Sequence, residues 1–207
     1  MQPTRLYLLR HGQTDWNLAG QLQGQTDIPL NDTGRSQARI AKGQLGGVCF
    51  DAVYASPLSR TLETAQIASG WPSDSIQPEQ RLKEICFGPW EGQRAQDLGP
   101  EFAPFFHDPA RYQPAPGGES LATLMERTGN FVQFVHQHHA GQTVLAVSHG
   151  AALHALLTCA LALPLDQFWS IPLGNCSLAI LEEQDGRFVL TETFTQPGAD
   201  NRHRYTR

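Results

Sequence analysis

An arginine and a histidine stand side by side near the start of the chain, where a short apolar run ends. Arg10-His11 follows residues 6–9, whose apolar pattern is typical of a buried strand. A second apolar run, residues 143–147, ends just before His149. The carboxyl ends of parallel strands form the ligand-binding edge of an open α/β sheet, and an Arg-His pair there suits a negatively charged ligand. Both histidines precede a glycine, and we expect them to share one anion site rather than to cap two unrelated strands.

The residue types expected at this edge are those that phosphoryl transfer requires. An imidazole whose other nitrogen donates a hydrogen bond is a good nucleophile toward phosphorus, and His11 is the candidate. Arg10 and Arg60 are predicted to hold the equatorial oxygens of the phosphoryl group, and their charge favours the neutral form of His11. His149 is predicted to donate a further hydrogen bond to that group. Glu84 is predicted to protonate the leaving alkoxide and later to deprotonate water.

Five further residues are predicted to contact the substrate. Three of them lie in the polar loop after the first strand, where side-chain amides and a backbone N–H can serve as neutral donors to a phosphate. The other two stand beside the second histidine and in a segment that follows the candidate acid. The predicted set is Asn17, Gln23, Gly24, Gly150 and Arg94.

Composition restricts the classes of partner. The 207 residues carry a formal net charge of -5, and the basic residues form no stripe, which argues against a nucleic-acid partner. The longest apolar stretch, residues 151–163, is interrupted by His154 and is too short to span a bilayer. The chain shows no secretory signal pattern, and its cysteines form no CxxC pair. We therefore expect a cytoplasmic protein that binds neither nucleic acid nor membrane.

Strand-like and helix-like segments alternate along the chain. Asp185-Gly186 is a strong hairpin signal, so the last two strands are expected to be antiparallel. The pattern predicts a single domain over residues 1–207 with a three-layer α/β/α sandwich, a mostly parallel sheet, an antiparallel edge and helices on both faces. Strands are expected near residues 6–9, 51–55, 75–78, 143–147, 176–181 and 187–194, and helices near 31–47, 57–70, 120–138 and from 151 onward.

The stretch from about residue 87 to residue 118 interrupts this alternation. It holds six prolines and clustered aromatic residues, which makes a long regular element improbable. We interpret it as an insertion with short helices that covers the site like a lid. Its aromatic side chains favour partly apolar substrates, although aromatic residues at such spacing more often form core.

Five short motifs occur in a fixed order along nearly the whole chain: Leu9–Asn17, Gly24–Leu30, Ser56–Thr61, Gly117–Ser120 and Val147–Gly150. Together they resemble the histidine phosphatase superfamily, in the branch of the cofactor-dependent phosphoglycerate mutases and their phosphatase relatives. The resemblance implies a phosphohistidine intermediate on His11, surrounded by Arg10, Arg60 and His149, with Glu84 as proton donor. It implies neither a metal nor another cofactor.

Departures from the mutase pattern bear on the reaction. Mutases of this branch hold the second anionic group of a phosphoglycerate with a tyrosine, a lysine and a pair of arginines. Here Phe87 stands where the tyrosine is expected, Ala95 stands near the place of the lysine with Arg94 beside it, and Arg111 is isolated. Without those cations a bisphosphorylated species is held less well, and water is expected to complete the reaction.

The sequence therefore favours a phosphomonoesterase that acts on small phosphorylated metabolites. A bisphosphoglycerate-dependent phosphoglycerate mutase is the first alternative, and a ribazole phosphate phosphatase of cobalamin synthesis is the second. A silent phospho-ligand-binding module is disfavoured, because such a module needs neither a nucleophile nor a proton donor. The expected partner is a small phosphate ester, and a homodimer is left open.

Overall fold

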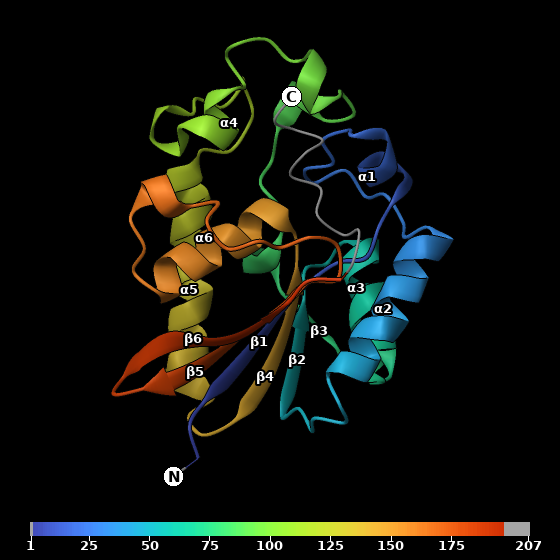
Figure 1. The fold of residues 1–207 in the computed structure, drawn as a ribbon, viewed down its shortest axis with the longest axis vertical. Coiled ribbons are helices and arrows are strands. Elements are labelled where there is room, and N and C mark those ends of the chain that lie inside the picture. Colours follow the sequence, from blue (N-terminus) through green and yellow to red (C-terminus); the bar gives the residue numbers. More distant parts are fainter. Residues whose placement is uncertain (1, 197–207) are drawn as a thin grey trace.

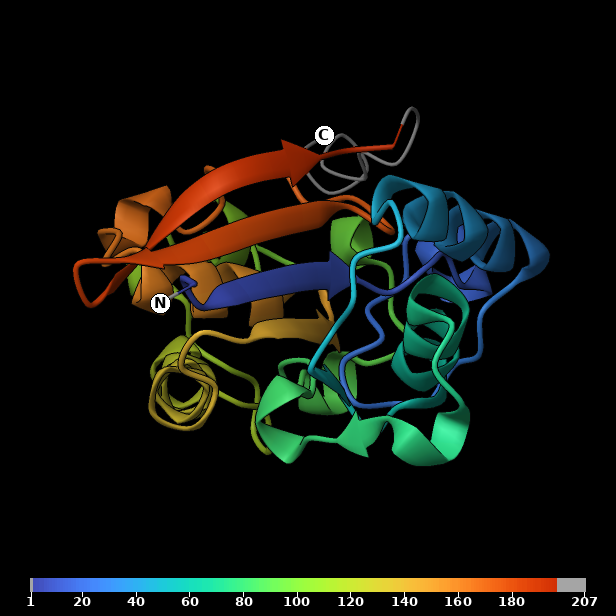
Figure 2. The ribbon, with the colours of Figure 1, turned by 90° about the horizontal axis from the view of Figure 1, so that it is seen from below.

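Six strands form one mixed sheet at the centre of the computed structural model, which describes residues 2–196. The strand order is β3-β2-β4-β1-β5-β6. Strands β1 to β4 are parallel to their neighbours, whereas β5 pairs antiparallel with β1 and β6 antiparallel with β5. Figure 2 shows the β5–β6 hairpin at one edge of the sheet. The strands are β1 (Arg5–Arg10), β2 (Ala52–Ala55), β3 (Gln77–Pro78), β4 (Thr143–Ser148), β5 (Leu178–Gln184) and β6 (Arg187–Phe194).

Helices cover both faces of the sheet, as the alternating pattern predicts. Helices α2 (Asp32–Gln44) and α3 (Ser59–Ser69) lie on one side, and α5 (Leu121–His138) and α6 (Gly150–Ala160) lie on the other (Figure 1). Strand β1 contributes to both cores, since Leu8 belongs to the α5–α6 side and Leu9 to the α2–α3 side. Both side chains are fully buried. A parallel strand that is covered on both faces reads as a continuous apolar run, which is the pattern of residues 6–9.

Local signals fix the ends of several elements where the sequence places them. The Asn31 side chain accepts a hydrogen bond from the Gly34 N–H at the start of α2, and Ser120 accepts one from the Thr123 N–H at the start of α5. Asp185 and Gly186, with φ angles of 50° and 75°, form the tight turn between β5 and β6. The predicted hairpin is therefore confirmed.

One helix was not predicted. The sequence between residues 13 and 30 reads as a polar loop, but it contains the short helix α1 (Asp15–Ala19). Thr14 and Asn17 form a capping box at its start, and Gly20 ends it in the left-handed conformation with φ of 73°. The capping box at its start and the glycine at its end stabilise this helix, which is too short to show a hydrophobic period.

The insertion contains only short helices, as predicted. These are α4 (Pro104–His107) and three single turns of 3-10 helix at 88–90, 95–97 and 109–111. The insertion lies beyond the carboxyl ends of the strands (Figure 1). Its aromatic residues Phe87, Phe102, Phe105 and Tyr112 are buried in one cluster that also includes residues of α5 and α6. Most of the aromatic side chains are thus core. Within residues 2–196, no helix is long and apolar enough to cross a membrane.

A close backbone contact explains the glycine after His11. An added Cβ on Gly12 overlaps the carbonyl oxygen of Gly34, in the first turn of α2. We expect Gly12→Ala to lower the free energy of unfolding by about 1–3 kcal/mol, because backbone must shift to make room. Gly43→Ala, in the same helix with nothing within 4 Å of its added Cβ, is the control and is expected to stabilise by about 0.5–1 kcal/mol. Urea unfolding compares them, and equal midpoints contradict the close contact.

Candidate active site

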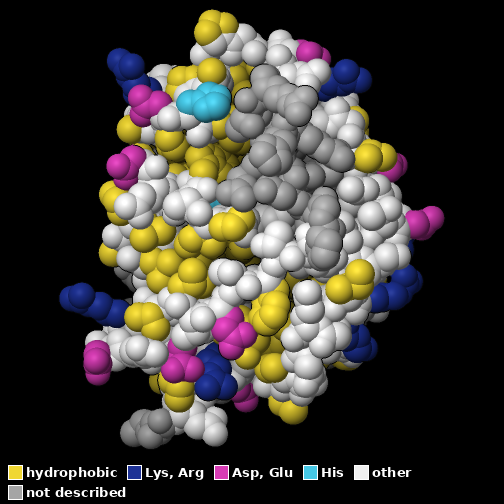
Figure 3. Space-filling model, viewed as in Figure 1, with side chains coloured by type: hydrophobic (Ala, Val, Ile, Leu, Met, Phe, Trp, Pro, Cys, Tyr) yellow, Lys and Arg dark blue, Asp and Glu magenta, His cyan; other side chains and the backbone are white. Residues whose placement is uncertain are grey.

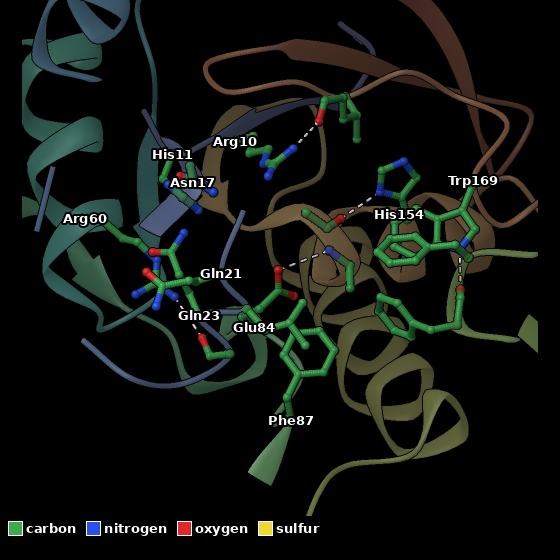
Figure 4. A pocket seen from close by; sticks show the side chains of 17 residues that line it. Arg10, His11, Asn17, Gln21, Gln23, Arg60, Glu84, Phe87, His154 and Trp169 are labelled. Carbon is green, nitrogen blue, oxygen red and sulfur yellow. Dashed lines mark hydrogen bonds between the residues drawn. The ribbon is translucent and has the colours of Figure 1, made fainter. Parts of the chain in front are cut away.

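A cavity opens at the carboxyl ends of β1 and β4, between the sheet and the insertion. One end is polar and carries His11, Arg10, Arg60 and Glu84 (Figure 4). The opposite wall is largely apolar and comes from the loop after α1, from the insertion, from α6 and from the segment after α6. Apolar side chains gather on this face of the molecule over α4 and α6 (Figure 3). The apolar wall consists of Leu22, Phe87, Phe105, Phe106, Ala151, Trp169 and Leu173.

His11 is held as a neutral imidazole with one nitrogen available. Its Nδ1 lies 2.7 Å from the Gly12 carbonyl oxygen, and since a carbonyl only accepts, Nδ1 carries the proton and Nε2 keeps its lone pair. The ring is buried. Burial lowers the pKa of His11 well below its ordinary value, and the charges of Arg60 and Arg10 lower it further. The ring is therefore neutral at neutral pH, and its Nε2 lone pair is available.

Arg10 and Arg60 bring two guanidinium groups to the polar end. Arg10 is the last residue of β1 and donates through Nη1 to the Leu173 carbonyl at 2.7 Å. Its buried Nε has no hydrogen-bond partner among residues 2–196, so a cationic donor remains for an anion in the cavity. Arg60 is fully buried in the first turn of α3. Burial lowers the pKa of Arg60 to about 10, so it stays charged at pH 7.

Two carbonyls hold the Arg60 guanidinium. Nη1 donates to Thr26 O and Nη2 donates to Gly24 O, both at 2.8 Å. Gly24 adopts φ of 49°, and the Glu91 carboxylate lies against it. Glu91 accepts hydrogen bonds from the Gln25 N–H at 3.0 Å, the Thr26 N–H at 2.9 Å and the Phe87 N–H at 3.1 Å. The Glu91 carboxylate thus connects two segments: the loop whose carbonyls hold Arg60, and the start of the insertion.

His149 lies behind Arg60 instead of facing the cavity. Its Nδ1 accepts a hydrogen bond from Arg60 Nε at 3.2 Å, and its Nε2 lies 2.8 Å from Ser56 Oγ. The His149 and His11 ring centroids are 5.2 Å apart. Burial, followed by the charge of Arg60, lowers the pKa of His149 well below its ordinary value. The sequence predicts a donor to the phosphoryl group at this position, but both ring nitrogens are engaged by protein groups, so in this structure His149 orients Arg60.

Glu84 reaches the cavity from the segment that follows a 3-10 turn. Its carboxylate accepts hydrogen bonds from the backbone N–H groups of Ala151 at 3.2 Å and Ala152 at 2.9 Å, in the first turn of α6. Gly150 lies between the two charged groups, since an added Cβ there is in ordinary van der Waals contact with the Arg10 guanidinium carbon at 3.4 Å and with Glu84 Oε2 at 3.6 Å. The candidate acid is therefore fixed at the polar end of the cavity.

The predicted substrate-binding residues divide into two groups. Asn17, Gln23, Gly24 and Gly150 all line the cavity. Arg94 does not: its side chain is exposed and lies outside the cavity lining, although its backbone pairs in an isolated bridge with Gln21, which does line the cavity. The prediction that Arg94 contacts the substrate is not supported by its position.

Several cavity residues were missed by the sequence analysis. Gln21, His154, Trp169 and Leu173 all line the cavity. The segment that contains the last two has no motif and no periodicity, and nothing in its sequence indicates that it turns back over β1. His154 was noticed only as an interruption in an apolar run. The available signal in the sequence was a single histidine within an otherwise apolar helical pattern.

A comparison with models of protein families identifies the family of this chain. The model of the histidine phosphatase superfamily (branch 1) matches residues 6–195. This chain belongs to that superfamily. The match spans all six strands and every cavity residue, and the members of the family are phosphatases or mutases.

Individual relatives span most of the chain. Phosphoserine phosphatase 1 of Hydrogenobacter thermophilus is 31% identical over 190 residues, which cover 90% of each chain. A probable phosphoglycerate mutase of Serratia proteamaculans is 31% identical over 202 residues, covering 96% of this chain and 94% of its own. Among solved structures, YhfR of Bacillus stearothermophilus has a TM-score of 0.83 and 37% identity, covering 91% of this chain and 95% of its own. These relatives include both a named phosphatase and a named mutase, so they leave the reaction open between the two.

Proposed function

We propose that this protein is a phosphomonoesterase that hydrolyses small phosphorylated metabolites through a phosphohistidine on His11. The observation that carries the proposal is the state of His11: a neutral ring whose Nδ1 is fixed by the Gly12 carbonyl, beside two arginines. Such a ring attacks phosphorus directly, and arginines stabilise the charge on the equatorial oxygens in the transition state. A binding module needs none of this arrangement.

The reaction has two steps. In the first, His11 Nε2 forms a bond to phosphorus, the phosphorus–oxygen ester bond breaks, and the leaving oxygen takes a proton from the Glu84 carboxyl. In the second, the Glu84 carboxylate removes a proton from water, the hydroxide attacks phosphorus, and the phosphorus–nitrogen bond breaks to release phosphate. One carboxyl group therefore acts first as an acid and then as a base, and the enzyme returns to its starting state.

The wall opposite His11 supports hydrolysis over mutase activity. A mutase has to retain a bisphosphorylated species, which requires cations away from the phosphate end. Among residues 2–196, the arginines and lysines that line the cavity are Arg10 and Arg60, and both lie at the phosphate end. Phe87 lines the wall and Arg94 does not reach it. A solved relative, the phosphoserine phosphatase of Entamoeba histolytica in complex with phosphoserine, has 30% identity and a TM-score of 0.82, and it adds support for a monoesterase.

The test is phosphate release together with isolation of the intermediate. We expect p-nitrophenyl phosphate to be hydrolysed in the presence of a chelator, and rapid quenching with labelled ester to leave acid-labile, alkali-stable phosphate on the protein. Phosphoglycerates and a bisphosphate primer are assayed in parallel. Primer-dependent interconversion without net phosphate release contradicts the proposal and identifies a mutase. Ligand binding without any turnover contradicts it as well and identifies a binding module.

A further inference from the structure

The Gly117–Ser120 motif has no place in the chemistry described so far. None of its residues lines the cavity. Its carboxylate, Glu119, instead makes an ion pair with Arg127 on α5, with 2.7 Å between Arg127 Nε and Glu119 Oε1. Their side chains are only 11% and 19% exposed, so this is a largely buried pair rather than a surface one. The other contacts of Arg127 and Glu119 indicate what this buried ion pair does.

Arg127 uses all of its donors within one small region. A guanidinium has five N–H donors. Two of them form a bidentate contact with the Glu119 carboxylate, from Nε at 2.7 Å and from Nη2 at 2.8 Å. The others bind backbone carbonyls: Nη1 donates to Arg81 O at 2.8 Å and to Lys83 O at 2.6 Å, and Nη2 donates to Glu84 O at 3.0 Å. The segment held in this way is the one that carries the candidate acid.

Glu119 fixes the other end of the same segment. Its Oε2 accepts a hydrogen bond from the Cys86 N–H at 3.3 Å, and its own N–H donates to the Cys86 carbonyl at 2.7 Å. Residues 83–87 belong to no helix or strand, so these contacts replace the hydrogen bonds that regular structure otherwise provides. Between Arg81 and Cys86 the backbone is thus bound at four residues to one ion pair.

We infer that Arg127 and Glu119 are positioning residues for Glu84, and that this is what the Gly117–Ser120 motif contributes. The inference rests on the proposed function, in which Glu84 protonates the leaving oxygen. Lysine cannot replace Arg127, because a single ammonium group cannot form a planar bidentate contact while also reaching three carbonyls. A displacement of the acid by about 1 Å is enough to lower its contribution on the order of 100-fold.

The experiment compares two esters that differ in their need for a proton. An alkyl phosphate such as phosphoserine has a strongly basic leaving oxygen, whereas p-nitrophenolate leaves without protonation. kcat/KM reports the steps up to departure of the leaving group. We expect Arg127→Lys to lower kcat/KM on the order of 10- to 100-fold for the alkyl ester and less than about threefold for the aryl ester. Glu119→Gln is the milder second variant, in case Arg127→Lys does not fold.

A control and a double variant separate positioning from general damage. Arg35→Lys removes a similar contact, the 2.7 Å ion pair with Glu63 between α2 and α3, and is expected to leave both rates unchanged. Adding Arg127→Lys to Glu84→Gln is expected to cause no further loss, because both act through one group. Equal losses on both esters, or losses that multiply in the double variant, overturn the inference. Failure of the proposed function is distinct, since it is seen without these variants: the wild type releases no phosphate, or its hydrolysis persists in His11→Ala.

Discussion

Replacing His11 by alanine is expected to reduce phosphate release on the order of 10⁴-fold or more, because it removes the atom to which the phosphoryl group transfers. The arginines remain, so the variant is still expected to bind inorganic phosphate or vanadate. The decisive pair of measurements is steady-state hydrolysis and anion affinity on the same preparation. His138→Ala, a substitution of an exposed histidine at the end of α5, is the control and is expected to behave like the wild type. Retention of more than about a tenth of the activity by His11→Ala excludes the phosphohistidine route.

The same residue sets the acid side of the pH profile. Protonation of Nε2 removes the nucleophile, so kcat/KM falls as the pH falls through the pKa of His11 in the free enzyme. Burial and the two arginines place that pKa well below 6.5. We therefore expect the activity to persist at pH values below 6.5, where an unperturbed histidine is mostly protonated. A profile that falls at pH 6.5 contradicts the described environment of His11.

Glu84→Gln is expected to be the second most damaging substitution. Glutamine preserves the size of the side chain and one acceptor for the first turn of α6, while its amide NH2 replaces the oxygen that accepts from the Ala151 N–H. The loss therefore combines proton transfer with one hydrogen bond, and comparison of an alkyl with an aryl ester separates the two. General acid catalysis contributes about 10²- to 10⁴-fold, and we expect a loss of kcat/KM in that range for an alkyl phosphate. For p-nitrophenyl phosphate the loss in kcat/KM is expected to be small, while kcat falls because water still needs a base.

Glu84→Asp is the matched control, since it keeps the acid but shortens its reach. We expect an intermediate loss on the alkyl ester. If Glu84→Gln hydrolyses both esters with equal reductions in kcat/KM, the carboxyl group is not the acid, and another donor at the cavity has to be sought.

The fold could be predicted from the sequence wherever a local pattern determined it. Apolar runs marked the parallel strands because these are buried on both faces, and Asp185-Gly186 marked the hairpin because few residues tolerate its positive φ angles. Convergence of Arg10, His11 and Glu84 followed from the geometry of parallel strands and from the family resemblance. Such features could be predicted because each depends on a short stretch of chain or on the shared carboxyl edge of the parallel strands.

Side-chain direction in irregular segments could not be predicted. Arg94 was assigned to the site from its place in the chain, but its side chain is exposed and lies outside the cavity lining. His149 was correctly placed at the carboxyl edge of the sheet, yet its ring nitrogens bind Arg60 and Ser56. The orientation of this ring depends on how α3 and the ends of β2 and β4 pack together, which no local pattern shows. Three of the five donors of Arg127 could not be assigned from the sequence either, because their acceptors are backbone carbonyls more than forty residues away.

The link through Glu91 also limits how this scaffold can change its selectivity. Its carboxylate holds both the Phe87 N–H and the loop whose carbonyls anchor Arg60, so the start of the insertion is mechanically tied to the phosphate end. We therefore expect a change in the length of residues 87–91 to disturb the proposed chemistry along with substrate recognition. Side chains beyond this point, such as Phe105 and Phe106, face the cavity without that tie. Redesign for a new ester should therefore keep residues 87–91 unchanged. Substitutions for substrate selectivity should be made in the part of the insertion that follows Glu91.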